Sequence, residues 1–456
     1  MSRVLLASVN PADEPYPVYP LGLSMVAAAL LAAGHEVRQA DLQAGGLEGL
    51  ARTAADLSPE VIGLSVRNVD NVDYLSGGGR WYVDAAREAV AALRRVSAAP
   101  IMLGGAGFSL LPEAILDYTG ADHGVVGEGE RACCELVAAL GRGEAAPRLM
   151  RGTQRLDGKD IPAPAIDGAL LRHYHAASGL AGVQTKRGCP HSCAYCSYPS
   201  LEGRAVRARE PQAVVEEMRR LAVDFGVREV VFTDSVFNDP HGHYLALAEE
   251  LARRPTGQAW SAFLQPRGLG REELSLLVRS GLKAVELGTD AASEATLAGL
   301  GKHFDFGQVA DLQQLCAQLG LPACHYVVFG GPGETPQTVR QGLANLERLE
   351  GAVVMAFTGL RLHRGTRLFE RAVAEGLAGP GDDLLRPVYY FSPDIDPREL
   401  GETLAAAFRG RRDRIFPPAH GQELMAAMRR LGYRGILWDT LIRRPRAPRQ
   451  APAAAG

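Results

Sequence analysis

Three cysteines on one short segment are the residues of this chain best suited to chemistry. They lie in KRGCPHSCAYCSYPS as Cys189, Cys193 and Cys196, with the spacing Cys-x3-Cys-x2-Cys. Three thiolates on one tight loop suit the ligation of an iron–sulfur cluster. Because a [4Fe–4S] cluster usually takes four protein ligands, three would leave one iron open to bind and reduce a small molecule. The segment therefore predicts a catalytic metal centre.

A zinc site is the alternative for the same segment, with His191 as a fourth ligand. Cys3His sites are well known for structural zinc. Here, however, all four ligands would be crowded into eight residues, whereas structural zinc sites usually use two separated pairs. We therefore favour the iron–sulfur cluster. The other cysteines fall in predicted helices or strands, where we expect small core residues: Cys133, Cys134, Cys316 and Cys324.

The composition of the whole chain indicates an ordered globular protein. It has 456 residues, of which 46% are hydrophobic and 22% charged. The 49 Lys and Arg nearly balance the 52 Asp and Glu, so the charge gives no reason to expect nucleic-acid or membrane-surface binding. The start of the chain lacks a signal-peptide pattern, and the longest apolar stretch, near 21–33, is too short to span a membrane. We expect a cytoplasmic protein with no membrane span.

Strand and helix patterns alternate through residues 1–145. Short β-rich runs and amphipathic runs follow one another, which predicts βαβ units and a parallel sheet with helices on both faces. Five such units suit a flavodoxin-like, Rossmann-type α/β domain, which binds ligands beyond the carboxyl ends of its strands. The strands are expected at 3–9, 35–42, 61–66 and 100–105, with a fifth strand and its turn at 123–130.

A second alternating series follows a Pro-rich connector at 146–178. It predicts a partial, TIM-like (β/α)6 barrel over 179–376, with chemistry at the carboxyl ends of its strands. We expect a small helical cap at 377–442, with a basic helix around 408–414, and a disordered tail at 443–456. The barrel strands are expected at 181–186, 229–233, 259–264, 283–288, 323–329 and 352–360.

The cysteine motif, with Tyr195 just before the last cysteine, resembles the signature of radical S-adenosylmethionine (SAM) enzymes. Further segments resemble, in order, the subgroup that carries an N-terminal cobalamin (B12)-binding domain. The resemblance extends from about residue 3 to about residue 395. It rests on 20–37, 104–130, GRAVRAREPQAVVEEM at 203–218, VVFTDSVFND at 230–239, GTDAASEATLAGLGKHF at 288–304, FGGPGETPQTV at 329–339 and 362–376.

The resemblance implies that the open iron of the cluster binds SAM and that polar groups at the strand ends hold it. The implied SAM contacts, besides Tyr195, are Asp234, Ser235, Gln265, Arg267, Glu286, Gly330, Gly331 and Gly333. For Glu286 an ion pair is the alternative, and for Asp234 a helix cap.

The resemblance also implies a cobalamin site at the carboxyl edge of the first sheet. Many such domains carry a cobalt-ligating His after the first strand, but the corresponding loop here, NPADEPYPVYPLG, has none. We therefore expect no His ligand to cobalt from this chain, with Arg67 beneath the corrin as a hypothesis. The implied contacts are Asn10, Tyr19, Gly22, Arg67, Gly104, Gly105, Gly127, Glu128 and Gly129.

The reaction that the resemblance implies is methylation of a carbon in a small-molecule or lipid substrate. A methyl group would pass from SAM through methylcobalamin after hydrogen abstraction by a 5′-deoxyadenosyl radical. An electron donor such as flavodoxin or ferredoxin would be the protein partner. A cyclase or mutase of the same family, and a zinc-stabilised binding protein, are the alternatives.

Overall fold

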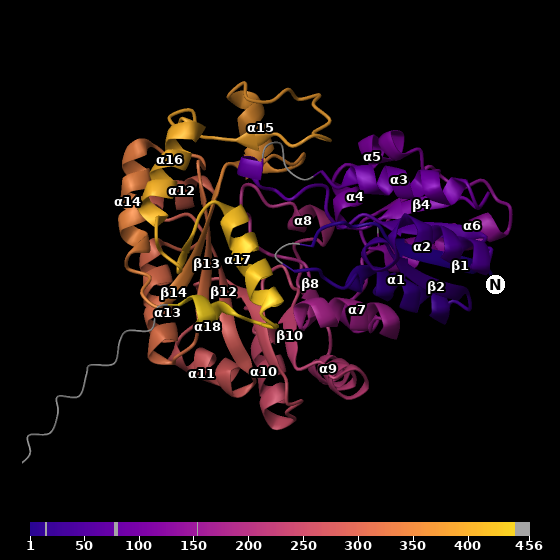
Figure 1. Cartoon of the computed structure of the whole chain (residues 1–456), viewed down its shortest axis with the longest axis horizontal. Coiled ribbons are helices and arrows are strands. Elements are labelled where there is room, and N and C mark those ends of the chain that lie inside the picture. The colour runs from indigo at the N-terminus through magenta and orange to yellow at the C-terminus, as the bar shows by residue number, and fades with distance from the viewer. Residues whose placement is uncertain (14–15, 77–80, 153, 443–456) are drawn as a thin grey trace, which may run out of the picture.

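The computed structural model describes residues 1–13, 16–76, 81–152 and 154–442 (Figure 1). Its two larger sheets are both parallel and belong to two halves of the chain that lie side by side. The expected disordered tail, 443–456, lies outside the described residues.

The first sheet has the strand order β2-β1-β3-β4-β5-β6, all parallel. The order of the first five strands is the flavodoxin-like order that the alternation predicted. A sixth strand was not predicted, and it lies in the expected connector. The strands are β1 (Arg3–Ser8), β2 (Glu36–Asp41), β3 (Val61–Ser65), β4 (Ile101–Gly104), β5 (His123–Val126) and β6 (Leu149–Arg151).

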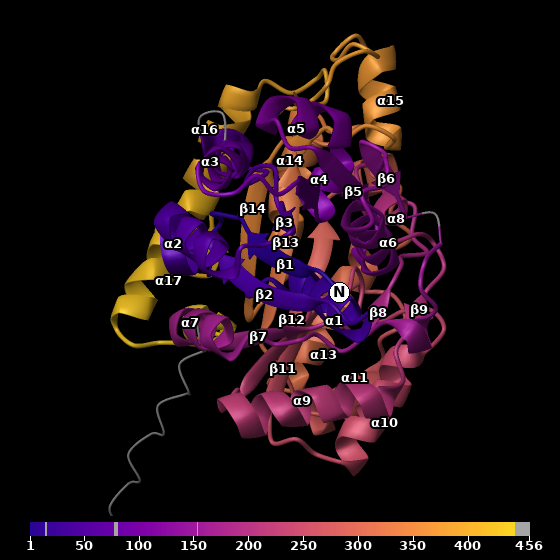
Figure 2. The same cartoon turned by 90° about the vertical axis from the view of Figure 1, so that its right-hand side faces the viewer.

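Helices cover both faces of this sheet because its strands are apolar on both sides (Figure 2). In β1, Val4 and Leu6 belong to the core beneath α1 (Leu21–Ala32) and α6 (Gly129–Gly141). The intervening Leu5 and Ala7 belong to the core on the opposite face. That face is covered by α2 (Leu42–Leu57), α3 (Val83–Arg94) and α5 (Pro112–Thr119); the short α4 (Ala106–Leu110) follows β4.

The second sheet is the open barrel, with the order β17-β14-β13-β12-β11-β10-β7. Its six predicted strands are present, and β17 (Arg414–Ile415) adds a seventh at the edge beside β14. The strands are β7 (Leu180–Val183), β10 (Glu229–Phe232), β11 (Ala259–Leu264), β12 (Leu282–Asp290), β13 (Ala323–Phe329) and β14 (Ala352–Thr358). Between them lie α9 (Pro211–Phe225), α10 (His243–Arg253), α11 (Arg271–Arg279), α12 (Glu294–Gly299), α13 (Phe306–Gln318) and α14 (Pro336–Leu346).

The last part of the C-terminal segment packs on the inner face of the barrel. Met425, Met428 and Trp438 pack with Ala284 and Cys324, which lie on the sheet face opposite the helices α9–α14. Figure 1 shows α17 and α18 on this side of the sheet. The segment comprises α15 (Arg367–Ala374), a ribbon of β15 (Leu360–Arg361) and β16 (Tyr389–Tyr390), α16 (Pro397–Phe408), β17, α17 (Pro418–Arg430) and α18 (Trp438–Leu441).

The predicted basic helix around 408–414 is wrong. Helix α16 ends at Phe408, and Gly410 has a φ of 74°. This left-handed backbone conformation cannot continue an α-helix. Arg414 is instead a strand residue whose buried guanidinium donates to the carbonyls of Ala352 and Leu346, at 2.9 Å each.

Long-range polar contacts join the two halves. Arg361 of β15 forms a buried ion pair with Asp70 of the first half, with Nε and Oδ2 2.9 Å apart. The Tyr174 hydroxyl of α7 (Gly168–Ser178) donates to Asp41 at 2.8 Å. None of the described helices has the length and apolar character that a membrane crossing requires.

Candidate active site

The three cysteines lie on a loop that is closed at its base by a small antiparallel ribbon. The ribbon pairs β8 (Lys186–Arg187) with β9 (Arg207–Ala208). Directly after β8, Gly188 has a φ of 90°, and a Cβ there would lie 2.0 Å from the Ala205 carbonyl oxygen. Only glycine allows the two arms of the loop to approach this closely.

Backbone hydrogen bonds hold this loop in place. The amide of Cys189 donates to the Gly203 carbonyl at 3.0 Å, and that of Ala194 donates to Leu300 at 2.8 Å. All three cysteines are free; Cys189 is buried, and Cys193 and Cys196 are half-buried. Burial raises the pKa of the Cys189 thiol, and it raises that of Cys196 to about 12. A bound metal centre overcomes such a penalty, because metal coordination deprotonates a thiol outright.

The arrangement fits a cluster better than a single zinc ion. Among the described residues, no group of three or more His, Cys, Asp or Glu side chains is placed to hold one metal ion. A zinc ion needs its ligand atoms within about 2.0–2.3 Å of a single point. A four-iron cluster instead binds each thiolate at a different iron, so its ligands need not converge.

A cation that the sequence analysis missed lies against the cluster loop. The Lys302 ammonium donates to Cys193 Sγ at 3.3 Å and forms an ion pair with Asp290. The Tyr195 hydroxyl donates to the same Asp290 carboxylate at 2.8 Å. Burial would lower the pKa of Lys302, but Asp290 and the neighbouring anionic groups raise it well above its ordinary value. The ammonium is therefore charged.

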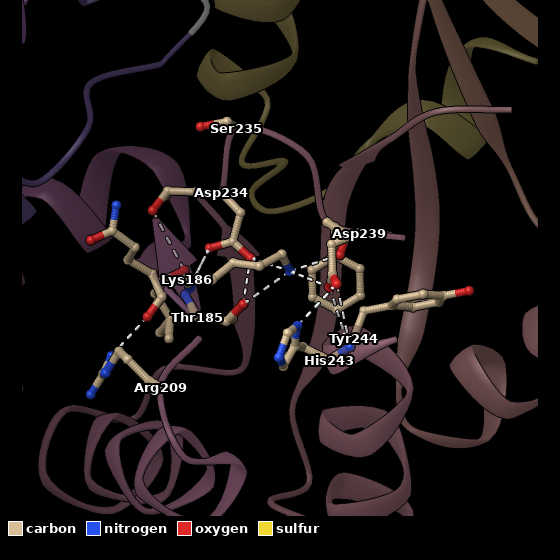
Figure 3. Close-up of polar contacts among 12 residues, drawn as sticks. Thr185, Lys186, Arg209, Asp234, Ser235, Asp239, His243 and Tyr244 are labelled. Atoms are coloured by element: carbon tan, nitrogen blue, oxygen red, sulfur yellow. Dashed lines mark hydrogen bonds and ion pairs between the residues drawn. The ribbon is translucent and has the colours of Figure 1, made fainter. Parts of the chain in front are cut away.

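Asp234, an implied SAM contact, is engaged inside the protein (Figure 3). Its carboxylate accepts from the Thr185 amide at 2.7 Å and from the Thr185 hydroxyl, and it forms an ion pair with Lys186 at 3.1 Å. Asp239 lies on the other side of the same ammonium, at 3.6 Å. All these side chains are buried, so the network anchors β8 to the loop after β10.

The other implied SAM contacts lie along the carboxyl ends of the barrel strands. The Ser235 hydroxyl donates to Glu202 at 2.9 Å, and Glu202 accepts from Gly188 next to the first cysteine. The carbonyls of Gln265 and Arg267 both accept from Asn238, which ties the loop after β11 to the loop after β10.

Glu286 is buried in β12 and faces the barrel interior. It accepts hydrogen bonds from Ser261 at 3.2 Å and Tyr326 at 3.1 Å. No described cation forms an ion pair with it within 4.0 Å, and burial raises its pKa. The ion pair considered for it in the sequence analysis is therefore not what holds it.

The Gly330–Gly333 turn follows β13 and folds around a buried carboxyl. The amides of Gly330 and Gly331 both donate to Glu334. Burial raises the pKa of Glu334 to about 7. Gly330 is in contact with the Phe391 ring, since a Cβ there would lie 2.7 Å from it.

A cavity of about 340 Å³ lies at the carboxyl edge of the first sheet. All nine residues implied as cobalamin contacts line it, from Asn10 to Gly129. Its far wall comes from the other half of the chain, through Arg187, Tyr198, Leu201 and Glu202 on or beside the cluster loop. Tyr198 and Leu201 bound the short helix α8. The structure thus brings a predicted cofactor site and the cysteine loop together.

The polar groups of this cavity fit a large ligand. Asn10 Oδ1 is buried without a hydrogen-bond partner, so it is free to bind a ligand amide. Gly105 has a φ of 101°, and a Cβ there would lie 2.6 Å from the Val66 carbonyl oxygen. This position therefore requires glycine, and the loop after β4 presents its backbone to the cavity. No histidine is among the described residues that line the cavity.

Two arginines from the barrel half form ion pairs with two glutamates at the edge of the cavity. Arg187 forms ion pairs with Glu130 at 2.5 Å and Glu128 at 3.3 Å, and Arg207 also pairs with Glu128. The arginines keep the pKa of Glu128 below its ordinary value, although burial opposes this. Glu128 was an expected contact but the two arginines were not, because they lie 59 and 79 residues after it in the chain.

Two family profiles match the chain. The B12 binding domain matches residues 9–137, and the Radical SAM superfamily matches residues 183–343. The first match covers β2 to β5 of the sheet that carries the cavity, and the second begins at the end of β7 and contains the cysteine loop.

Methyltransferases are among the proteins that resemble the chain over most of its length. The tryptophan 2-C-methyltransferase of Streptomyces laurentii is 29% identical, over 78% of this chain and 72% of its own. A structure of a radical SAM methyltransferase from Kitasatospora setae, with cobalamin and a [4Fe–4S] cluster bound, has a TM-score of 0.84 and 27% identity, over 97% of both chains. A second structure of that enzyme, with tryptophan and a SAM analogue bound, has 25% identity and the same TM-score, over 96% of this chain and 97% of that one.

Proposed function

This chain is a cobalamin-binding radical SAM methyltransferase, and we propose that it methylates a carbon of a small molecule, with tryptophan as the first candidate substrate. Its cofactors are a [4Fe–4S] cluster, SAM and cobalamin. The proposal of tryptophan is supported by the full-length likeness to an enzyme crystallised with that amino acid.

The shared wall of the cavity is the observation that carries the proposed methyl transfer. Tyr198, Leu201 and Glu202 follow the last cysteine within six residues, and they line the same cavity as the glycine-rich edge of the first sheet. A corrin held by that edge would therefore face the cysteine loop. Methyl transfer through cobalamin requires such a meeting of the two sites, because reacting groups must lie close together.

When bound, the cofactors supply the methyl group and the one-electron chemistry. The chain holds the cluster through Cys189, Cys193 and Cys196. It contacts cobalamin through Asn10, Arg67, the glycines of the cavity and Glu128. Arg67 lines the cavity and donates to Asn68 at 2.7 Å, and we propose that it would lie beneath a bound corrin, where the described lining offers no histidine.

SAM is held, in this proposal, by the strand ends of the barrel above the cluster loop. Tyr195, Ser235, Gln265, Arg267, Glu286 and the Gly330–Gly333 turn border that region, whereas Asp234 acts by anchoring β8. A low-potential electron donor such as flavodoxin or ferredoxin reduces the cluster, and we place the enzyme in the cytoplasm, where such donors work.

Anaerobic turnover with methyl-labelled SAM tests the proposal. The chain is reconstituted with iron, sulfide and cobalamin, reduced, and incubated with tryptophan and with other small aromatic molecules. We expect label in a carbon-methylated product and one S-adenosylhomocysteine per methyl group. 5′-Deoxyadenosine is counted in the same samples, and its absence beside labelled product would remove the hydrogen-abstraction step.

The same experiment separates the alternatives. Turnover to 5′-deoxyadenosine with no S-adenosylhomocysteine and no label in product would indicate a rearrangement or cyclisation and reject methyl transfer. Label in another small molecule, but not in tryptophan, would reject only the proposed substrate.

A Cys193→Ala variant supplies the first prediction. We expect it to lose the iron-dependent absorbance near 400 nm and all turnover, because two thiolates cannot hold the cluster in a defined site. Cys316 lies on the buried face of α13, and Cys316→Ala is the matched control. It should keep both the absorbance and the turnover. Full iron content and activity in Cys193→Ala would contradict cluster ligation at this residue.

A further inference from the structure

Lys302 is a buried cation in contact with one cluster cysteine. It lies just after α12, and only 8% of its side chain is exposed. Its ammonium nitrogen donates to Cys193 Sγ at 3.3 Å, within the limit for a hydrogen bond to sulfur. Of the described lysines, Lys186 and Lys283 pair with carboxylates of the barrel, and neither contacts a cluster cysteine.

Three neighbours fix the direction of the Lys302 side chain. Asp290 forms the ion pair, and the Tyr195 hydroxyl donates to the same Asp290 oxygen at 2.8 Å. The ammonium also lies 5.7 Å from the centre of the Tyr195 ring and 5.5 Å from that of Phe304. The ion pair and the two aromatic rings therefore keep the ammonium next to the Cys193 sulfur.

The backbone of Asp290 adopts a conformation that is uncommon for residues other than glycine. Its φ is 58°, in the left-handed region, which residues other than glycine rarely adopt. Such outliers persist where the surrounding structure enforces them, and they concentrate at functional sites. The pairing of β12 with β13 also shifts register between Gly288 and Asp290. The end of β12 is thus distorted at the residue that orients Lys302.

We propose that Lys302 is a positioning residue that stabilises the reduced cluster through its hydrogen bond to Cys193. This inference rests on the proposed function, because it requires a cluster on the three cysteines. One electron from a low-potential donor reduces the cluster and adds one unit of negative charge, while no covalent bond forms or breaks. Hydrogen bonds to the sulfurs and nearby charge set the potentials of such clusters. A fixed ammonium at one thiolate therefore makes reduction easier.

A redox titration of the reconstituted holoenzyme tests this role. The reduced cluster is followed by electron paramagnetic resonance in wild type, Lys302→Met and Lys302→Arg, with iron content measured in each sample. Met keeps most of the length of the side chain without its charge, and Arg keeps the charge. Lys283→Met is the matched control, because Lys283 lies in β12 and its ion pair with Glu229 is remote from the cysteine loop.

We expect the midpoint potential of Lys302→Met to be more negative than that of wild type. At a fixed potential the ratio of reduced to oxidised cluster should fall about tenfold, which corresponds to a shift of about 59 mV for one electron. Lys302→Arg should lie nearer wild type, and Lys283→Met should match it. Equal potentials in wild type and Lys302→Met at full iron content would overturn the proposal.

Loss of the cluster is also informative. If Lys302→Met holds no iron, the proposal stands only if Lys302→Arg holds the cluster at a potential near that of wild type. If Lys302→Arg also fails, the proposal is rejected in favour of a steric requirement at this position. If wild type itself binds no iron, the proposed function fails instead.

Discussion

Glu334 illustrates at the residue scale how the barrel mouth tolerates a buried carboxyl. It is 1% exposed, and its carboxyl group accepts hydrogen bonds from the amides of Gly330 and Gly331 in the turn after β13. Its pKa is raised by burial from 4.5 to about 7. The folded state therefore keeps a proton that the unfolded chain releases between these values. Stability consequently falls as pH rises from about 4.5 to about 7 and changes no further above that range.

A Glu334→Gln variant removes this dependence, because an amide accepts the same hydrogen bonds and does not titrate. Between pH 5 and pH 8 we expect wild type to lose up to about 3 kcal/mol of unfolding free energy more than the variant. Urea unfolding at several pH values measures the difference. Parallel pH profiles for the two proteins would contradict the raised pKa.

Arg67 is the second residue with a testable consequence. If it covers the lower corrin face, Arg67→Ala should admit water to cobalt. The paramagnetic resonance spectrum of cob(II)alamin should then change from that of a ligand-free ion to that of a water-bound one. Arg148→Ala, which removes an exposed arginine paired with Asp117, should leave the spectrum unchanged. Identical spectra in Arg67→Ala and wild type would place Arg67 elsewhere.

At the element scale, the buried network of Figure 3 links β8 to the loop after β10. Lys186 is 2% exposed and lies between the Asp234 and Asp239 carboxylates. Replacing it leaves two buried carboxylates without their cation, and breaking a buried pair in this way is strongly destabilising.

We therefore expect Lys186→Met to lower the unfolding free energy by about 3–5 kcal/mol. Lys283→Met, at a pair whose lysine is 35% exposed, should cost about 1 kcal/mol or less. Chemical denaturation of both variants makes the comparison. Similar losses in the two would show that the network of Lys186 has no special role.

The elements themselves were largely predictable from the sequence, and the exceptions have a common cause. Strands such as 259–264 and 323–329 match to the residue because they are apolar runs bounded by turns. β6 and β17 have only three and two residues, and they exist because a distant strand accepts their hydrogen bonds. Lys302 was missed for the same reason, since its partner Cys193 is 109 residues away. The cysteine triad was found because its spacing is local.

At the scale of the whole molecule, buried charges hold the cobalamin half against the barrel half. Arg361 and Asp70 are 291 residues apart, and their side chains are 3% and 2% exposed. Arg361 also donates to the Leu384 carbonyl at 2.7 Å. The ion pair therefore joins the two halves, and the bond to Leu384 fixes the guanidinium within its own half.

A double-mutant cycle measures how strongly this contact couples the halves. We expect Arg361→Met and Asp70→Asn each to cost about 3 kcal/mol or more, and the double variant to cost clearly less than their sum. The exposed pair Arg142–Glu144, which water screens, should show no clear coupling. Additive losses at Arg361 and Asp70 would show that the pair does not join the halves.

The wall that the two halves share has a consequence for how the enzyme matures in a cell. One side of the cavity proposed to hold cobalamin is built by residues that follow the cysteines within six positions. Any disorder of that loop before it acquires iron would leave the vitamin's pocket incomplete. Iron supply and vitamin supply would then act on one assembly step, so a cell short of iron would also retain less vitamin on this protein.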